Sequence, residues 1–535
     1  MEVSELLEAP RPDLTALYPL PPSPLTHLGS LLAGHDAPGS DDWQHRRLES
    51  EFQACHFAET PREPLRDSHT DQSITILHAK VAQKSYGNEK RFFCPPPCVY
   101  ISGQGWRLLQ DNLKASGFGD SVYQLRGYMC LDNSSQSQTD AFKLVLDEQP
   151  DSRQLFACAK TLYISDQDKR KHFRLLLSLF LGRQEVGSFH SRLIKVISKP
   201  SQKRQSMKNA DLCISSCSRV ALFNRLRSQT VSTRYLSVEG GAFVASARHW
   251  TAFTITMVEE QRADFTLSES FVCYGCVVQL VCTETGIALP PMVIRKVTKQ
   301  HAILDVDEPV SQLHKCAFQF RDSPHSYLCL SNDNIILYHA QSPMRDPSRV
   351  VLNDGSCWTI IGVESVEFSF NQGLAQAQSP VSPFPVISAL EVGLTGSGVQ
   401  VQVNGGGHVA MLEIHGENFG PHVKVWFGNH EAETMFKSPK SLVCVVPDVS
   451  VFTEGWRCLR RTITVPLSVI RLDGIIYRTP YSFTYTPELQ LVPALRGPEQ
   501  GRRQEGPQGE QKGDDLLETI HQEFTRANFH LFMQS

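Results

Sequence analysis

The sequence predicts an all-β protein made of several domains in series. Short runs of alternating apolar and polar residues recur between about residues 70 and 487, and an Asp-Gly pair at 473–474 gives the strongest hairpin signal. Pro-rich seams interrupt this pattern. The chain has 535 residues, 41% of them hydrophobic. At ~150 residues per domain this length provides for three or four packed cores.

The two ends of the chain differ in composition from the middle. Pro residues crowd the first 65 residues, with Gly and Ser between them, and the residues after Pro487 are polar and low in complexity. Such segments bury too little apolar surface to offset the entropy of folding. We therefore expect a disordered arm over 1–68 and a disordered tail over 488–535.

Strands are expected almost throughout the middle of the chain. Residues 423–427 form a period-two apolar run, and the apolar runs on either side of Asp473-Gly474 predict two strands of one hairpin. Short helices are expected only around 105–113 and over 168–181. The Pro-rich residues 378–385 predict a boundary before a C-terminal β-sandwich.

Several function classes are excluded or disfavoured. No apolar run approaches the roughly 18 residues of a membrane helix, and the acidic N-terminus lacks the pattern of a secretory signal. We therefore expect a soluble intracellular protein with no membrane partner. The sequence contains no Walker lysine loop, no HExxH and no GxSxG motif. The glycines at 405–407 are best read as a turn, so we expect no enzyme activity.

The fifteen cysteines are expected to be reduced thiols, because no signal for secretion precedes them. Of the three close pairs, only Cys273 and Cys276 have the two-residue spacing of a zinc knuckle, and they fall in a run that predicts a strand. No second half-site follows at the spacing of a zinc finger. We expect no metal and no cofactor.

Positive charge is concentrated locally, although 52 basic and 56 acidic residues leave the chain at a net −4. Lys80, Lys84, Lys90 and Arg91 are interleaved with aromatic residues. A second stretch has Asp211 as its only acid. Such basic segments are typical of contacts with DNA phosphates. The alternatives are that they form a solvated surface stripe, or that residues 199–208 are a nuclear import signal. The second stretch contains Arg192, Lys195, Lys199, Lys203, Arg204, Lys208, Arg219, Arg225, Arg227 and Arg234.

Five segments resemble the CSL family, the Suppressor of Hairless and immunoglobulin-kappa-J recombination-signal-binding transcription factors. They are residues 83–100 (QKSYGNEKRFFCPPPCVY), 197–201, 220–236 (VALFNRLRSQTVSTRYL), 310–318 and 425–428. The resemblance extends from about residue 70 to 487. Elsewhere the sequence departs at scattered positions from the family's Notch effector, and these departures make the chain most similar to the RBP-J-like branch of that family.

The resemblance implies a more specific all-β fold. It implies a Rel-like β-sandwich over 69–220, a β-trefoil over 221–382, and a Rel-like IPT/TIG sandwich over 383–487, between the disordered arm and tail. The first two of these are the DNA-binding domains of the family. The partner implied is double-stranded DNA with a GTGGGAA-type site, bound by a monomer in the nucleus.

Three segments are implied to contact the DNA. Arg91 is our candidate for guanine O6 and N7 in the major groove, and Lys199 with Ser201 for a second contact there or on phosphate. Arg225 and Arg227 are expected on phosphate, and Ser228 and Gln229 at the minor groove. The segments comprise Gln83, Lys84, Ser85, Tyr86, Gly87, Asn88, Glu89, Lys90, Arg91, Phe92 and Phe93; Ser198, Lys199, Pro200, Ser201, Gln202 and Lys203; and Arg225, Leu226, Arg227, Ser228, Gln229 and Thr230.

The resemblance also implies a protein partner site, because family members that respond to Notch bind a short Trp-Pro-containing Notch peptide in an apolar groove of the trefoil. The groove aligns here with Phe265, Leu267, Ala288 and Leu337. Leu267 stands where the family has valine, and Leu337 where it has glutamine. The larger side chain and the lost amide both disfavour the peptide. We therefore expect weak or absent Notch binding.

The remaining partners are expected to be coactivators or other DNA-binding transcription factors, with the chain acting as an activator. Two alternatives stay open at this point. One is a Notch-pathway effector or corepressor platform on the same scaffold. The other is a β-domain adaptor that binds proteins and not DNA.

Overall fold

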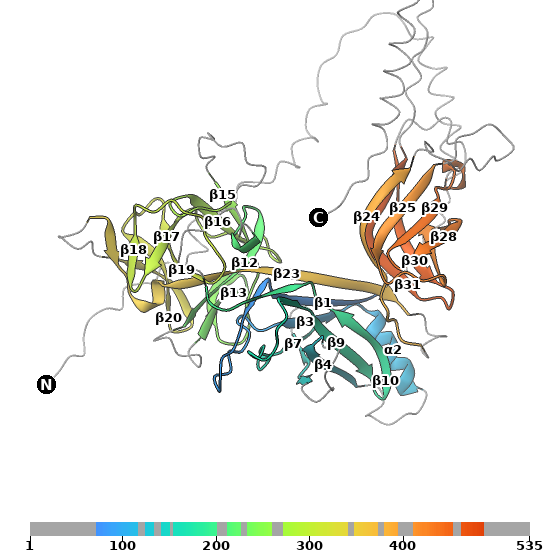
Figure 1. The fold of residues 1–535 in the computed structure, drawn as a ribbon, viewed down its shortest axis with the longest axis horizontal. Helices are drawn as coiled ribbons and strands as arrows, with labels where there is room; N and C mark the ends of the chain where they lie inside the picture. The colour runs from blue at the N-terminus through green and yellow to red at the C-terminus, as the bar shows by residue number, and fades with distance from the viewer. Residues whose placement is uncertain are drawn as a thin grey trace, which may run out of the picture.

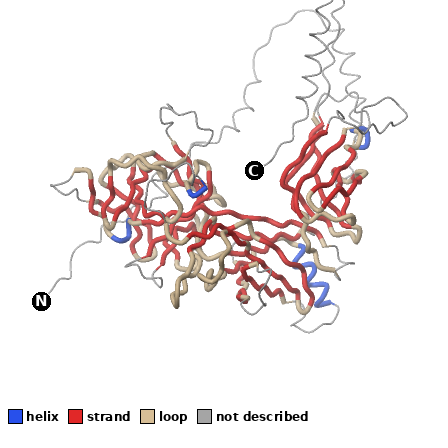
Figure 2. Tube along the Cα trace, in the orientation of Figure 1, coloured by secondary structure: helices blue, strands red, loops and turns tan. Residues whose placement is uncertain are grey.

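The fold is that of a chain built almost entirely from strands, and the predicted all-β class is confirmed (Figure 1, Figure 2). The computed structural model describes residues 71–115, 124–132, 141–149, 154–200, 211–225, 233–258, 271–340, 347–372, 379–393, 410–452 and 462–485. The expected disordered arm and tail, and the glycines at 405–407, lie outside these residues. None of the helices within the described part is long and apolar enough to cross a membrane.

The N-terminal unit is a sandwich of short sheets. Strands β1, β3, β7 and β6 pair in series, and β10, β9, β4 and β5 form a second sheet whose apolar side shares the same core. A third sheet, β2–β11–β8, lies beside them. The strands are β1 (Gln72–Ala79), β2 (Val81–Gln83), β3 (Cys98–Ser102), β4 (Leu125–Leu131), β5 (Phe142–Leu144), β6 (Asp147–Glu148), β7 (Leu155–Cys158), β8 (His172–Phe173), β9 (Leu175–Leu181), β10 (Gln184–His190) and β11 (Ile194–Ile197).

One of the two predicted helices is confirmed and the other is wrong. Helix α2 (Gly105–Ala115) covers the predicted residues and buries Trp106 and Leu109 in the core of the N-terminal unit. Residues 168–181 instead form β8 and β9. Every second residue of β9 is buried, and β4 and β10 pair with it on either side. This run is apolar except for Ser178 and shows no regular alternation, so it fits a helix or a buried strand equally well.

The central unit contains β12 to β22 and the first half of β23, around a core of its own. Trp358 is fully buried there, and its Nε1 donates to the carbonyl of Leu328 at 2.9 Å. The strands are β12 (Ser218–Arg225), β13 (Thr233–Glu239), β14 (Ala242–Ser246), β15 (Phe253–Met257), β16 (Val277–Cys282), β17 (Met292–Thr298), β18 (His301–Ile303), β19 (His314–Phe320), β20 (Ser326–Ser331), β21 (Asn334–His339), β22 (Arg349–Val351) and β23 (Trp358–Asn371).

The 14-residue strand β23 is shared by all three units and runs across the molecule in Figure 1. Its first residues pair with β12 and β19 of the central unit, and residues 363–370 pair with β1 of the N-terminal unit. Its last three residues pair with β31 of the C-terminal unit. One hydrogen-bonded strand therefore links all three units, which also share buried apolar clusters.

The C-terminal unit packs two sheets face to face. One is β24–β25–β29–β28, and the other contains β27, β26, β30 and β31. The predicted hairpin is confirmed, because β30 and β31 pair across the turn that contains Asp473 and Gly474. The strands are β24 (Val386–Gly393), β25 (Met411–Glu417), β26 (Val423–Phe427), β27 (His430–Glu431), β28 (Thr434–Ser438), β29 (Ser441–Val445), β30 (Ile463–Arg471) and β31 (Ile476–Tyr485).

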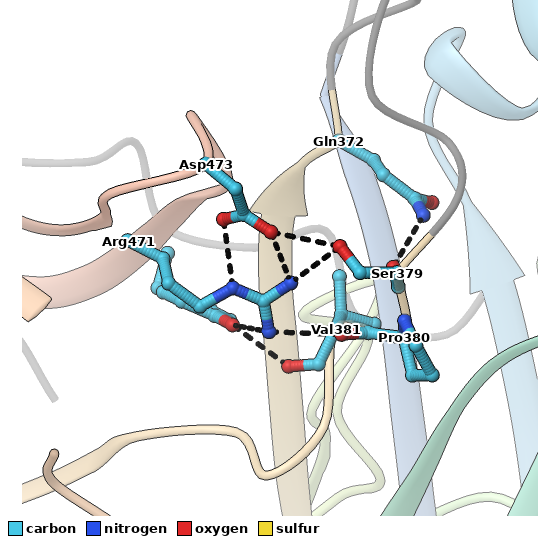
Figure 3. A network of polar contacts seen from close by, with 7 residues as sticks. Gln372, Ser379, Pro380, Val381, Arg471 and Asp473 are labelled. Atoms are coloured by element: carbon cyan, nitrogen blue, oxygen red, sulfur yellow. Dashed lines mark hydrogen bonds and ion pairs between the residues drawn. The ribbon is translucent and has the colours of Figure 1, made fainter. Parts of the chain in front are cut away.

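A polar network around Arg471 fastens this hairpin to the segment that enters the C-terminal unit (Figure 3). The Arg471 guanidinium donates to both carboxylate oxygens of Asp473, at 2.7 and 2.6 Å, and to the Pro380 carbonyl at 2.8 Å. Ser379 Oγ accepts from Arg471 at 3.0 Å and donates to Asp473 at 2.7 Å. These bonds, first of all those from Arg471, lower the pKa of Asp473 to about 2.

Candidate nucleic-acid interface

Two of the three predicted DNA-contacting segments are brought together by one parallel strand pair. Strands β2 and β11 pair so that Gln83 lies opposite Ile197. The pairing continues past the strand ends, since Lys84 N donates to the Ile197 carbonyl at 2.9 Å and Gln83 Nε2 to the Ser198 carbonyl at 3.2 Å. Segments more than 100 residues apart in sequence therefore leave the same edge of the sheet together.

The tip of the first segment is a tight turn. Tyr86 and Glu89 form a bridge on either side of Gly87 and Asn88, and Glu89 N donates to the Tyr86 carbonyl at 3.2 Å. Gly87 has φ +58°, a conformation that side chains with a Cβ rarely adopt. The turn leaves the side chains of Tyr86 and Lys90 exposed to solvent.

Arg91 is held at the base of this turn. Its backbone N–H donates to the buried hydroxyl of Ser85 at 2.9 Å. Its guanidinium lies 5.8 Å from the centre of the Tyr86 ring and 3.1 Å from the Glu89 carboxylate. The side chain is 29% exposed, so a planar cation is presented at the surface in a restricted set of orientations.

The other residues of the first segment divide between surface and scaffold. Lys90 places its ammonium 5.3 Å from the centre of the Tyr163 ring, whereas the Lys84 ammonium donates to the carbonyl of Asp168 inside the unit. Phe93 is buried and stacks on Phe173 at 5.5 Å. Phe93 therefore anchors the segment to the core.

The second and third predicted segments are described only in part. Ser198 and Lys199 are exposed directly after β11, and Pro200 follows them. Arg225 is exposed at the end of β12, with its guanidinium 5.4 Å from the Phe223 ring. The remaining predicted residues lie outside the described part of the chain: Ser201, Gln202 and Lys203, and Leu226, Arg227, Ser228, Gln229 and Thr230.

A cavity of about 150 Å³ lies between the first segment and the central unit. Three cations line it, Arg225 together with Lys160 and Arg248, and none of the described residues that line it is acidic. Sequence analysis missed Lys160 and Arg248, because each stands outside the basic segments and only the fold brings it to Arg225. The cavity is lined by Phe92, Phe93, Cys94, Pro96, Lys160, Arg225, Thr233, Tyr235, Ala247 and Arg248.

Part of the predicted basic stretch is used within the protein. Lys195 forms an ion pair with Asp211, and Arg234 with Asp333 at 3.0 Å. Arg219 donates to the hydroxyl of Ser365 at 2.7 Å. The count of basic residues therefore overstates the charge available to DNA, and Lys203, Arg204, Lys208 and Arg227 lie outside the described residues.

The predicted partner groove is described at two of its four positions. Ala288 and Leu337 are both half-buried in the central unit, and Leu337 packs against its core. Phe265 and Leu267 lie outside the described residues. The groove therefore stays a prediction.

The pair Cys273 and Cys276 does not lie in a strand as predicted. Cys273 makes a single bridge to Pro309, a turn with Gly275 at φ +90° follows, and β16 begins only at Val277. Within the described ranges, no three His, Cys, Asp or Glu side chains are placed to share a metal ion.

Comparisons with known proteins agree with this architecture. The family models that match are LAG1, DNA binding, over residues 74–211; the beta-trefoil DNA-binding domain, over 239–358; and the TIG domain, over 397–485. They fall on the N-terminal, central and C-terminal units in that order.

Three relatives are similar along the chain. The Recombining binding protein suppressor of hairless-like protein of Homo sapiens is 56% identical over 528 residues, covering 96% of this chain and 98% of the relative. The Mus musculus protein of the same name is 56% identical over 535 residues, with the same coverage. Transcription factor cbf11 of Schizosaccharomyces pombe is 27% identical over 352 residues, covering 58% of this chain and 54% of the relative.

These matches confirm the resemblance read from the five segments, including its RBP-J-like branch. They also confirm that the chain is not an enzyme, because the matched domains are DNA-binding domains and the relatives are named as binding proteins or transcription factors. The chain belongs to the CSL family of DNA-binding transcription factors.

Proposed function

We propose that the chain acts in the nucleus and binds GTGGGAA-type sites in double-stranded DNA as a monomer. The observation that carries this proposal is the β2–β11 pairing, which brings residues 83–93 and the described residues 198–200 out from one sheet edge. A guanine-rich site requires guanidinium or ammonium donors directed at O6 and N7 of the guanines. Arg91 and Lys199 follow these two neighbouring strands, on segments that leave the sheet at this edge.

Arg91 is assigned to base readout. The hydrogen bond from Arg91 N to Ser85 fixes the backbone, and the Tyr86 ring and Glu89 carboxylate limit the orientations of the guanidinium. A bidentate contact with guanine profits from such restriction, since less side-chain entropy is lost on binding. Glu89 must give up its ion pair with Arg91 or share it when DNA binds.

The cavity between the first two units is assigned to the DNA backbone. Lys160, Arg225 and Arg248 offer cationic donors there, and no carboxylate of the described residues lines the cavity beside them. A phosphate oxygen accepts from Arg and Lys at any base sequence, so these contacts set affinity and position more than specificity. Because the cavity lies between units, one phosphate there also fixes their relative position on the duplex.

The DNA proposal is tested by electrophoretic mobility shift with a GTGGGAA duplex and a scrambled duplex of equal length and composition. We expect a stable complex only with the GTGGGAA duplex when competitor DNA is present. Equal binding to both duplexes would contradict sequence-specific recognition. No binding to either would favour the adaptor function.

We further propose that the chain activates transcription with other DNA-binding factors or coactivators, and responds weakly or not at all to Notch. The RBP-J-like resemblance and the two changed groove positions support this assignment. A reporter carrying intact or mutated GTGGGAA elements tests the sign of the effect. Expression of the chain should raise the signal from the intact element alone, and a fall below baseline would favour the corepressor alternative.

A further inference from the structure

Two cysteines of the N-terminal unit face each other across a strand pair. Cys98 is the first residue of β3 and Cys158 the last of β7, and the antiparallel register places them directly opposite. The Cys98 thiol is 3.6 Å from Cys158 Sγ and donates to it. Both are free thiols in this structure.

The backbone at this pair has the geometry that a disulfide needs. Ala159 N donates to the Pro97 carbonyl at 2.9 Å, one position outside the pair on each strand. This bond makes Cys98 and Cys158 a non-hydrogen-bonded pair of the ladder, in which opposite Cα atoms are about 4.5 Å apart. Disulfides accept Cα separations of roughly 4.4–6.8 Å. The sulfurs need to approach to roughly 2 Å, and the strands do not have to shift as a whole.

The surroundings of the two thiols differ. Cys98 is fully buried in a cluster that also contains Phe156 and Trp250, and burial raises its pKa. Cys158 is half-buried. The hydrogen bond from Cys98 and the nearby Lys160 cation lower its pKa, against the effect of its own burial. Cys158 is therefore the thiol that both reaches solvent and forms a thiolate more readily.

We propose that Cys98 and Cys158 are a reversible dithiol site, oxidised by a hydroperoxide to a disulfide between β3 and β7. The Cys158 thiolate attacks one peroxide oxygen, which breaks the O–O bond, forms a sulfenic acid and releases hydroxide. The Cys98 sulfur then attacks the Cys158 sulfur and displaces its hydroxyl, which takes up the Cys98 proton and leaves as water. The proton that Cys158 gave up on forming its thiolate converts the released hydroxide to the second water. Two thiols and one hydrogen peroxide give one disulfide and two waters, and a dithiol reductant reverses the reaction.

The site lies next to the candidate nucleic-acid interface. Residues 94–97 connect the predicted base-reading segment to Cys98, and the Pro96 carbonyl accepts both from the Cys98 thiol at 3.5 Å and from Trp250 Nε1 at 2.8 Å. Oxidation removes the first of these donors. The disulfide would thus alter the connection that carries the segment 83–93, although its formation does not depend on DNA binding.

The test is peptide mapping of the full chain after treatment with hydrogen peroxide, with free thiols alkylated and no reductant added. We expect a cross-linked pair of peptides containing Cys98 and Cys158, lighter than their sum by two hydrogen atoms and lost on treatment with dithiothreitol. Cys444, a buried thiol of the C-terminal unit, should remain free in the same sample. Recovery of Cys98 and Cys158 as free thiols under these conditions would overturn the proposal.

Variants separate the roles of the two sulfurs. In Cys98→Ala the Cys158 sulfenic acid has no resolving thiol, so we expect it to accumulate and react with dimedone. In Cys158→Ser we expect no dimedone adduct at Cys98. An adduct at Cys98 but not at Cys158 would overturn the assigned order of attack.

The midpoint of thermal unfolding shows whether the disulfide strains the native strands, independently of how the bond was formed. A cross-link that closes a 60-residue separation constrains the unfolded chain. We expect oxidised wild type to unfold a few degrees above the reduced protein, and Cys158→Ser to show no such difference. A lower midpoint for the oxidised protein would contradict the inference that the native strands accept the bond.

Discussion

Among single residues, Arg91 combines a restrained backbone with a partly exposed guanidinium, so its removal should affect specificity more than affinity for random DNA. We expect Arg91→Ala to weaken binding to a GTGGGAA duplex by about 1–3 kcal/mol, the value of a bidentate contact with guanine. Fluorescence anisotropy with cognate and scrambled duplexes measures both affinities. Lys203→Ala is the matched comparison: it should weaken both complexes alike and flatten their salt dependence. Equal losses of specificity in the two variants would contradict the assigned roles.

A second residue, His78, should make stability depend on pH. It is fully buried in β1, and burial lowers its pKa below the usual 6.5 although Nδ1 donates to the Ala79 carbonyl. The unfolded chain therefore binds a proton that the folded chain does not, and stability falls as the pH drops below about 6.5. Urea unfolding at pH 7.5 and 5.5 should show a smaller decrease for His78→Gln than for wild type. The exposed His325→Gln should retain the full decrease.

At the scale of secondary-structure elements, the Arg471 network determines how firmly the β30–β31 hairpin is held. Arg471→Ala removes the guanidinium donors from the Asp473 carboxylate and the Pro380 carbonyl, leaving Ser379 Oγ as a donor to Asp473. Hydrogen bonds to charged groups are worth about 1.5–3 kcal/mol. We expect a loss of that size in denaturant unfolding. Arg107→Ala breaks an exposed ion pair with Glu148 and should cost about 0–1 kcal/mol. A comparable loss in both variants would show that the network is no stronger than a surface pair.

The predicted trefoil groove is the element on which we expect partner choice to depend. Leu267 in place of valine and Leu337 in place of glutamine are each expected to cost about 1–3 kcal/mol of peptide binding, through overfilling and through an unpaired polar group. Together we expect them to lower affinity by two or more orders of magnitude. Titration calorimetry with the Notch peptide should give no submicromolar binding for wild type and a gain for Leu267→Val with Leu337→Gln. Tight binding by wild type, or no gain in the double variant, would contradict this account.

The elements also show which local sequence patterns suffice to predict structure. The Asp473-Gly474 hairpin and helix α2 were predictable, because turn chemistry and helical spacing act over a few residues. Strand β9 was not, because its uniform apolar run hides which residues face the core. The segment 83–93 was identified from its likeness to a family, whereas Lys160 and Arg248 join the site only through tertiary contacts.

At the scale of the whole molecule, we expect the chain to function with every thiol reduced and without metal. Protein kept from oxidants should react with a maleimide at all fifteen cysteines after denaturation without prior reduction. Treatment with a chelator should leave DNA binding unchanged in the mobility-shift assay. Loss of binding on chelation would revive a zinc site at Cys273 and Cys276.

The shared strand β23 limits how such a chain can change in evolution. Its alternation buries Val366, Phe368 and Phe370 beneath the N-terminal unit, while Glu367 points to solvent. Because side chains alternate with a period of two, one residue inserted after Gly362 would leave the central unit in register and turn these three apolar side chains outward. A compensating bulge would have to arise in the same strand. Insertions and deletions should therefore be tolerated in the surface loops of each unit and excluded from the strand that they share.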